Sequence, residues 1–146
     1  MRWYLPGLAA LTFMAAAPAA TPPNLDVRFV VPCQPGDPTF VPVGGGEELC
    51  LGKDKVLDAS GVIKVQRYPV LPKAVMEITD AASDRLYDLT YDKVGERLGF
   101  VFNGRLIFVP LIYEPVKTKD LQISLKNDPD DIDALVAAFP GVVAAQ

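Results

Sequence analysis

The feature that most constrains the fold is an apolar stretch interrupted at its centre by Asn-Gly: FVFNGRLIFVP, from Phe100 to Pro110. An Asn-Gly pair between two apolar runs is the strongest short-range signal for a two-residue type I′ turn, because both central residues of that turn need positive φ. The stretch therefore predicts a β-hairpin whose turn is formed by Asn103 and Gly104.

The alternation of side chains along this hairpin predicts two apolar faces. One face pairs Phe102 with Arg105, Phe100 with Ile107 and Leu98 with Val109; the other pairs Val101 with Leu106 and Gly99 with Phe108. One face must pack against a helix, and the other must be covered by a further layer or by a partner. Either can be the core face. Pro110 lacks a backbone donor, which indicates that the second strand is bulged or lies at an edge.

Period-two alternation and β-branched residues predict the other strands. Extended segments are expected at 26–31, 48–51, 62–67, 74–79 and 121–125. Between the last two, Thr79 or Asp80 is a suitable cap for a helix, and Gly95 suits its C-terminal end. The apolar stripe of this helix is expected at Ala82, Leu86, Leu89 and Val94.

A second helix is expected after Asp128, with Pro129 in its first turn and Pro140 at its end. The acidic run DPDDID at its start interacts favourably with the positive end of the helix dipole, and it lacks the glycine and glutamate that an EF-hand calcium loop requires. The C-terminal half thus reads strand, helix, three strands, helix. This order predicts an α+β fold, with an antiparallel sheet and two helices packed on one face.

The first nineteen residues have the features of a secretory signal peptide. Arg2 supplies a positive charge, no charge follows until after Ala20, and small residues precede an expected cleavage site after Ala19. The alternative is an uncleaved anchor, but Pro6 interrupts the apolar run, which falls short of the roughly 20 residues that span a bilayer. We expect a soluble, exported protein, periplasmic or secreted, with no transmembrane span after cleavage.

Cys33 and Cys50 are expected to form a disulfide, because an exported chain with two cysteines usually pairs them. The segment between them holds three prolines and the run Gly44 to Gly46, so it can form little regular structure of its own. A disulfide closing such a loop stabilises a fold by about 3 kcal/mol in the chain-entropy model. The alternative is a redox or metal pair, which would need C-x-x-C spacing or histidine ligands.

Composition excludes several functions. The net charge is −4 without a basic stripe, so nucleic acid is not an expected partner. The chain has no histidine, and its serines and threonines have no recognisable base, so no catalytic residue, metal site or cofactor is expected. Asp84, Asp88 and Asp92 fall on the outer face of the first helix, where such a ladder is typical of a solvated surface.

An ordered set of short matches resembles the periplasmic head subdomain of the SecD/SecDF protein-export factors. The set comprises Leu89-Thr90, Val94-Gly95, RLGFVFNGRLIFVP (97–110), Glu114-Pro115 and Ile123-Ser124, followed by an acidic-capped apolar helix. This sequence departs at Leu125, where the family has glycine, at Phe108-Val109, where it has small residues, and at Asn103, where it has aspartate. No base subdomain or membrane spans accompany the match, so the family's proton-driven motor activity is not carried over.

Together with the signal-like start and the two cysteines, the resemblance predicts a division into a signal peptide (1–19), an N-terminal strand with a disulfide-stapled loop (20–56) and a head-like domain (57–140), with 20–146 forming one folded unit. It also implies a non-enzymatic exported module that binds a partner protein or an extended polypeptide, with a link to protein export. The candidate contact residues are Val101, Leu106, Phe108 and Pro110.

Other interpretations stay open at this point. Phe108 could instead cover Gly99 and fill a gap in the core, because aromatic residues pack over strand glycines in this way. The alternative functions are a small exported ligand- or metal-binding protein and a carboxylate-based hydrolase, which would need two convergent acids.

Overall fold

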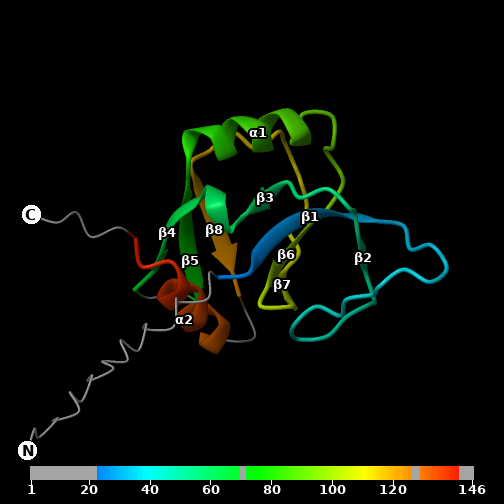
Figure 1. Cartoon of the computed structure of the whole chain (residues 1–146), viewed down its shortest axis with the longest axis horizontal. Helices are drawn as coiled ribbons and strands as arrows, with labels where there is room; N and C mark the ends of the chain where they lie inside the picture. The colour runs from blue at the N-terminus through cyan, green and yellow to red at the C-terminus, as the bar shows by residue number, and fades with distance from the viewer. Residues whose placement is uncertain (1–22, 70–71, 126–128, 142–146) are drawn as a thin grey trace, which may run out of the picture.

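The computed structural model describes residues 23–69, 72–125 and 129–141 (Figure 1). The predicted signal peptide, its cleavage after Ala19 and the predicted cap Asp128 lie outside these residues. Among the described residues, no helix is long and apolar enough to cross a membrane.

The strands form two antiparallel sheets (Figure 1). The five-stranded sheet has the order β2-β1-β6-β7, with β3 also paired to β1. Its strands are β1 (Leu25–Val31), β2 (Cys50–Leu51), β3 (Leu57–Asp58), β6 (Leu98–Phe102) and β7 (Arg105–Phe108). The three-stranded sheet has the order β4-β5-β8. Its strands are β4 (Val62–Arg67), β5 (Lys73–Ile78) and β8 (Asp120–Ser124).

Two α-helices complete the fold, α1 (Asp80–Thr90) and α2 (Pro129–Ala138). The predicted cap of α1 is present, because the Thr79 hydroxyl accepts a hydrogen bond from the amide of Ala82 at 3.1 Å. The predicted extension of its stripe to Val94 is wrong: the helix ends at Thr90, and Val94 is 54% exposed. The Thr90 hydroxyl contributes to this end, since it accepts from the amide of Val116 at 2.9 Å and ties the helix terminus to the 110–118 segment.

The α+β fold class with antiparallel strands and two helices is confirmed, but the strands are divided between two sheets instead of forming one. The division arises because β5 pairs on one side with β4, through a short connection in which Tyr68 donates to the Lys73 carbonyl at 3.0 Å, and on the other side with β8. No edge of β5 is left for β6. One apolar core cluster nevertheless spans both sheets and both helices, including Val27, Met76, Leu86, Phe100, Ile123 and Leu135.

The β6–β7 hairpin has the predicted turn, with φ of 51° at Asn103 and 80° at Gly104. The first two predicted pairs, Phe102 with Arg105 and Val101 with Leu106, are confirmed. Beyond them the predicted register is wrong, because a register shift leaves one extra residue on β7 and Phe100 pairs with Phe108. The shifted register continues along the hairpin: Leu98 donates to the carbonyl of Pro110, and a bridge joins Arg97 to Leu111.

This bulge changes what surrounds Phe108 and Gly99. The Phe108 ring packs against Phe100, with ring centroids 5.3 Å apart. Gly99 is instead covered by Leu51 and Leu106, since a Cβ at position 99 would lie 2.7 Å from a methyl carbon of Leu51. The predicted pairing of Phe108 with Gly99 is therefore wrong, and Phe108 does not serve as the cover for that glycine.

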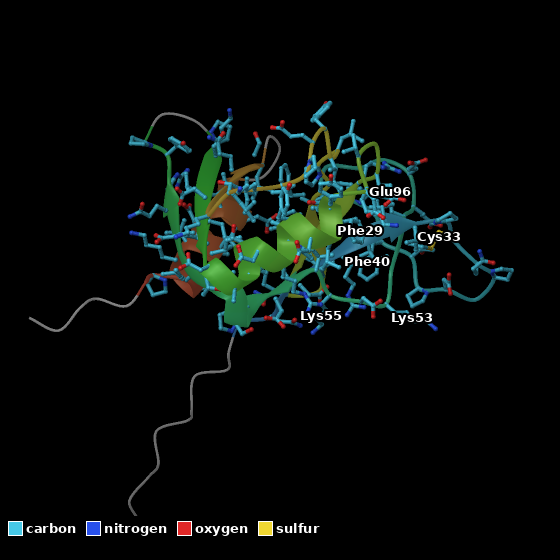
Figure 2. All side chains as sticks on the ribbon, turned by 90° about the horizontal axis from the view of Figure 1, so that it is seen from above. Phe29, Cys33, Phe40, Lys53, Lys55 and Glu96 are labelled. Atoms are coloured by element: carbon cyan, nitrogen blue, oxygen red, sulfur yellow. A yellow bond between two sulfur atoms is a disulfide. The ribbon has the colours of Figure 1, made fainter. Side chains whose placement is uncertain are left out.

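The disulfide between Cys33 and Cys50 is present, with an S–S distance of 2.04 Å. The loop that it closes extends to the end of the molecule away from α2, where Figure 2 labels Cys33 and Phe40. Its later residues turn back over the hairpin: Phe40 and Leu49 form a bridge, and the amide of Val43 donates to the carbonyl of Leu106 at 2.9 Å. The loop therefore covers one face of the five-stranded sheet.

Candidate functional site

The structure separates the candidate contact residues into two pairs. Val101 and Leu106 are buried, with exposed fractions of 7% and 1%. They form a small second cluster with Leu49, against which Phe40 and Leu51 pack. Phe108 and Pro110, by contrast, are partly exposed. The hairpin face that carries Val101 and Leu106 is thus closed by the chain's own disulfide loop, and it offers no surface to another molecule.

Phe108 lies between two adjoining hollows that separate β7 from β8. The first has a volume of about 320 Å³, and its lining includes Phe100, Phe108, Pro110, Leu111, Tyr113, Leu121 and Gln122. The second has a volume of about 400 Å³, and its lining includes Val43, Ile107, Phe108, Ser124 and Leu125. Phe108 contributes to both, so the hollows meet at its ring. We call the two together the inter-sheet groove, because β7 and β8 belong to different sheets.

The rim of the groove carries unusually exposed apolar side chains. Leu111 is 42% exposed and Tyr113 is 81% exposed. The segment that bears them is held firmly: Gly95 donates to the carbonyl of Ile112, and Ile112 donates to the carbonyl of Glu96, both at 2.8 Å. Exposed apolar side chains on an ordered segment beside an apolar hollow are typical of an interaction site.

Of these lining residues, the sequence pointed to Phe108 and Pro110 but not to Leu111 or Tyr113. The available signal was the short apolar run LIY between Pro110 and Glu114. Prolines on both sides of such a run place it in a connection, and a large apolar side chain in a connection has less chance of burial than one in a strand.

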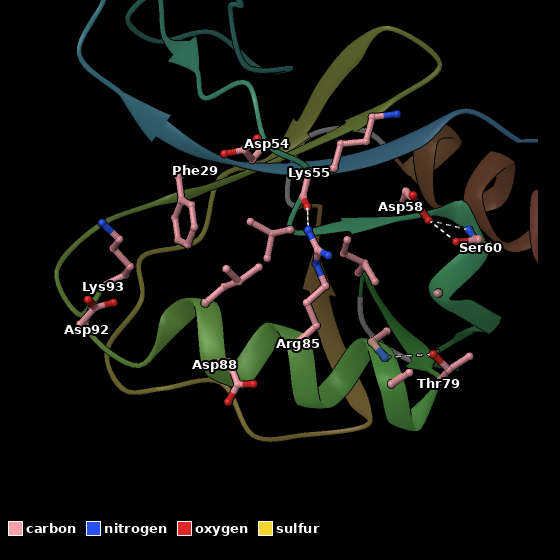
Figure 3. A pocket seen from close by; sticks show the side chains of 16 residues that line it. Phe29, Asp54, Lys55, Asp58, Ser60, Thr79, Arg85, Asp88, Asp92 and Lys93 are labelled. Atoms are coloured by element: carbon pink, nitrogen blue, oxygen red, sulfur yellow. Dashed lines mark hydrogen bonds between the residues drawn. The ribbon is translucent and has the colours of Figure 1, made fainter.

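A larger pocket of about 880 Å³ lies between α1 and the chain around β3 (Figure 3). Its lining includes the apolar residues Phe29, Val56, Leu57 and Leu89. It also includes charged residues of both signs: Asp54, Lys55, Arg85, Asp88, Asp92 and Lys93. Figure 3 shows Arg85 reaching from α1 towards β3, where it donates to the carbonyl of Lys55 at 2.9 Å. Charges of both signs at an open rim are well solvated, so we assign the binding role to the apolar inter-sheet groove.

The Asp58 carboxylate of this pocket is held by hydrogen bonds to Ser60. A hydrogen bond from the Ser60 hydroxyl, together with one from the Ser60 amide at 3.0 Å, holds the pKa of Asp58 below its usual value. Asp58 is therefore ionised at neutral pH and is a poor proton donor. Its role is structural, because it caps the short 3₁₀ helix η1 (Ala59–Gly61). Asp88 and Asp92 are exposed, in line with a solvated helix face.

No group of three or more potential metal ligands occurs within residues 23–69, 72–125 and 129–141. In the first hollow of the groove, the described lining includes a single carboxylate, Glu114. A glycosidase-type mechanism would need two carboxyl groups facing each other across the substrate. The first hollow therefore has the composition of a binding surface for apolar groups, whereas Glu47, Arg97 and Asp131 add charged side chains to the lining of the second.

Comparisons with known proteins support the fold. No protein-family model and no curated protein sequence matches the chain. A solved structure of SecDF, described as a membrane component that enhances protein export, superposes with a TM-score of 0.63 at 16% identity, covering 81% of this chain and 62% of that one. A crystal structure of SecDF in a super-membrane-facing form superposes with a TM-score of 0.61 at 15% identity, covering 84% of this chain.

The chain spans only part of these SecDF chains, 62% of the first and 19% of the second. At such low identity the similarity concerns the fold alone. The expectation drawn from the hairpin and the short matches around it is confirmed at that level: the chain has a SecDF head-like fold.

Proposed function

We propose that this chain is a non-enzymatic, exported SecDF head-like module that binds polypeptide through the inter-sheet groove. The observation that carries the proposal is the contrast between the two apolar surfaces of the hairpin. The Val101 and Leu106 face is buried under the disulfide loop, whereas Phe108 stays partly exposed between two hollows, beside Leu111 and Tyr113.

Export to the periplasm or beyond is part of the proposal. The Cys33–Cys50 disulfide supports it, because structural disulfides persist in oxidising compartments. The signal-like sequence of residues 1–19 also supports it. We propose that residues 20–146 fold as one unit, since a single core cluster includes residues from Leu25 to Phe139.

We also propose a role beside protein export, which the likeness in fold supports. The SecDF structures that resemble this chain belong to a membrane component that enhances export. A polypeptide that has just crossed a membrane is unfolded and exposes apolar side chains, which are the groups that the inter-sheet groove would bury. We propose that the ligand is such a chain; a folded partner protein is the second candidate, favoured by the large exposure of Tyr113.

The direct test is equilibrium binding of the mature chain to a short fluorescein-labelled peptide in which valine and threonine alternate between two terminal lysines. Leu111→Ser removes an apolar side chain at the groove rim. Ile63→Ser is a matched control, because Ile63 is exposed to almost the same degree, 43% against 42%, but lies on β4. We expect Leu111→Ser to weaken binding about tenfold and Ile63→Ser to leave it unchanged.

Equal effects of the two substitutions would show that the peptide adheres to any exposed apolar residue, and the proposed site would be wrong. Absence of peptide binding to the unsubstituted protein would refute polypeptide binding itself. Circular dichroism and thermal unfolding of each variant show that the fold is retained, which we expect because both side chains are substantially exposed.

A further inference from the structure

The backbone of β8 points to the way in which a polypeptide occupies the inter-sheet groove. We infer that the polypeptide adds to the free edge of β8 as an extended strand, making main-chain hydrogen bonds to Gln122 and Ser124. This inference rests on the proposed function and specifies its binding mode.

The pairing of β8 fixes which of its backbone groups face outward. Ile78 donates to the carbonyl of Lys119 at 2.8 Å, and Leu125 donates to the carbonyl of Pro72 at 3.1 Å. In an antiparallel pair these bonds involve every second residue, so residues 119, 121, 123 and 125 direct their backbone groups towards β5. The N–H and C=O groups of Gln122 and Ser124 therefore face away from the sheet.

Among the described residues, the outward backbone groups of Gln122 and Ser124 lack local hydrogen bonds of the kind that satisfy those of Asp120. Asp120 also faces outward, but its amide and carbonyl both bond to the Thr118 hydroxyl at 3.1 Å. No described residue makes a comparable hydrogen bond to the outward groups of Gln122 or Ser124. An exposed row of this kind is a template for pairing with another chain.

The other long edges of the two sheets are obstructed. On β4, the amide of Val65 donates to the carbonyl of Phe139 after α2 at 2.9 Å, and the register with β5 shifts between Val62 and Lys64. On β7, the amide of Val43 occupies the carbonyl of Leu106, and the hairpin bulge precedes Pro110. Covering segments, bulges and prolines are the devices by which proteins block edge pairing.

Within the part of the chain that the structure describes, the β8 edge has none of these devices. Its pairing with β5 runs without a register shift from Asp120 to Ser124, and the stretch from Leu121 to Leu125 (LQISL) contains neither proline nor charge. The β2 and β3 strands are too short to serve, at two residues each. Among the described strands, β8 is therefore the edge best suited to accept a polypeptide.

The inter-sheet groove runs along this same edge. Leu121 and Gln122 line its first hollow, Ser124 and Leu125 line its second, and Phe108 faces both. A strand added to β8 would direct alternate side chains to the side of Leu121 and Leu125, towards Phe108. The remaining side chains would lie on the side of Gln122, which is exposed.

This geometry defines the chemistry of the occupant. It is an extended segment with apolar side chains at the positions that would face Phe108, Leu121 and Leu125. Main-chain bonds supply sequence-independent affinity, and the alternate side chains supply selectivity. An unfolded exported polypeptide offers many such segments.

The test uses the same valine–threonine peptide and the substitution Gln122→Pro. Proline removes the outward amide proton without touching a bond to β5, and an edge strand tolerates proline at such a position. Gln122→Ala is the matched control, since it shortens the side chain but keeps the amide. We expect Gln122→Pro to bind the peptide about tenfold more weakly than Gln122→Ala does, so that the difference reports the loss of the amide and not of the side chain.

A second measurement holds even if Gln122→Pro disturbs folding. Two peptides of the same sequence are N-methylated at alternate residues, in the two possible registers, and titrated into the unsubstituted protein. Strand addition requires that one N-methylated peptide loses binding while the other retains it, because only every second amide bonds to β8.

The outcomes distinguish this inference from the function on which it rests. If Leu111→Ser weakens binding but neither Gln122→Pro nor either N-methylated peptide has an effect, the groove binds polypeptide by side chains alone, and strand addition is wrong. If the unsubstituted protein binds no peptide, the proposed function fails first. If sedimentation shows a dimer that Gln122→Pro dissociates, the occupant of β8 is a second copy of this chain, and the inference is overturned.

Discussion

The two apolar surfaces of the β6–β7 hairpin have the same kind of sequence but different surroundings. Val101 and Leu106 are sealed beneath the disulfide loop, whereas Phe108 is left partly open beside Leu111 and Tyr113. The difference shows that apolar content does not by itself mark a contact surface. Whether an apolar face is accessible depends on which other segments of the chain cover it. Here the disulfide loop, which has little regular structure, covers only the face with Val101 and Leu106.

The largest expected effect tests the covered face. Leu106→Ala should lower the free energy of unfolding by about 2 to 5 kcal/mol, because Leu106 is 1% exposed and its loss leaves a cavity. Leu111→Ala should lower it much less, by no more than about 1 kcal/mol, because Leu111 is 42% exposed and its loss leaves no enclosed cavity of that size. Urea unfolding followed by circular dichroism measures both.

Similar costs for the two leucines would contradict the comparison. In particular, a small cost at Leu106 would mean that the disulfide loop leaves that face in solvent, and the sealed surface would then be a second candidate for binding.

The next effect tests what holds the loop in place. The double substitution Cys33→Ser and Cys50→Ser should lower the free energy of unfolding by about 3 kcal/mol, because the unfolded chain regains the entropy that the disulfide removes. Amide hydrogen exchange should accelerate at Val43, whose amide bonds to Leu106 across the covered face.

Exchange at Thr79, whose amide bonds to Gly61 far from the loop, is the internal control and should change only as much as global stability does. An equal acceleration of hydrogen exchange at the Val43 and Thr79 amides would show that the disulfide stabilises the whole fold and does not specifically hold the loop over Leu106.

A smaller effect tests the turn that sets both faces. Asn103→Ala should cost about 1 kcal/mol of stability, because Asn103 has a φ of 51° and alanine tolerates the left-handed region less well. Asn103→Gly is the control and should cost much less, since glycine adopts positive φ freely. Equal stabilities of the alanine and glycine variants would contradict the type I′ turn.

The smallest effect concerns the pocket of about 880 Å³ between α1 and the chain around β3, here called the α1 pocket, which lies outside both faces of the hairpin. The hydrogen bond from Ser60 lowers the pKa of Asp58, so the Asp58 carboxylate contributes stability that is present above its unfolded pKa and is lost as the pH falls through its lower folded pKa. Ser60→Ala should raise the pKa of Asp58 towards its ordinary value, as measured by NMR titration.

Because the α1 pocket is separate from the inter-sheet groove, Ser60→Ala should leave peptide affinity unchanged. A clear loss of affinity in this variant would favour the α1 pocket over the groove as the binding site, and it would reverse our assignment.

Local signals predicted the elements that depend on few residues. The Asn103-Gly104 turn, the Thr79 cap and the Cys33–Cys50 pairing each follow from the chemistry of one or two side chains. The resemblance to the SecDF head rested on the spacing of short matches, and the fold it implied is present.

Other features depend on contacts between distant segments, which local patterns do not contain. The bulge on β7 shifts the register in which Pro110 and Leu111 pair with Leu98 and Arg97, and the sealing of Leu106 depends on where the loop around Val43 returns. The open edge of β8 reflects the division of the strands into two sheets. The turn alone specified the hairpin register correctly for two pairs and no further.

The most direct test of the account is chemical-shift mapping of the isotope-labelled mature protein during titration with the valine–threonine peptide. We predict that the amide signals of Phe108, Gln122 and Ser124 shift, while those of Leu49 and Leu106 under the disulfide loop stay in place. Shifts centred on Leu49 and Leu106, with none at the groove, would contradict the claim that the chain seals the Val101 and Leu106 face of its hairpin and leaves Phe108, at the margin of the core-facing side, accessible to a polypeptide.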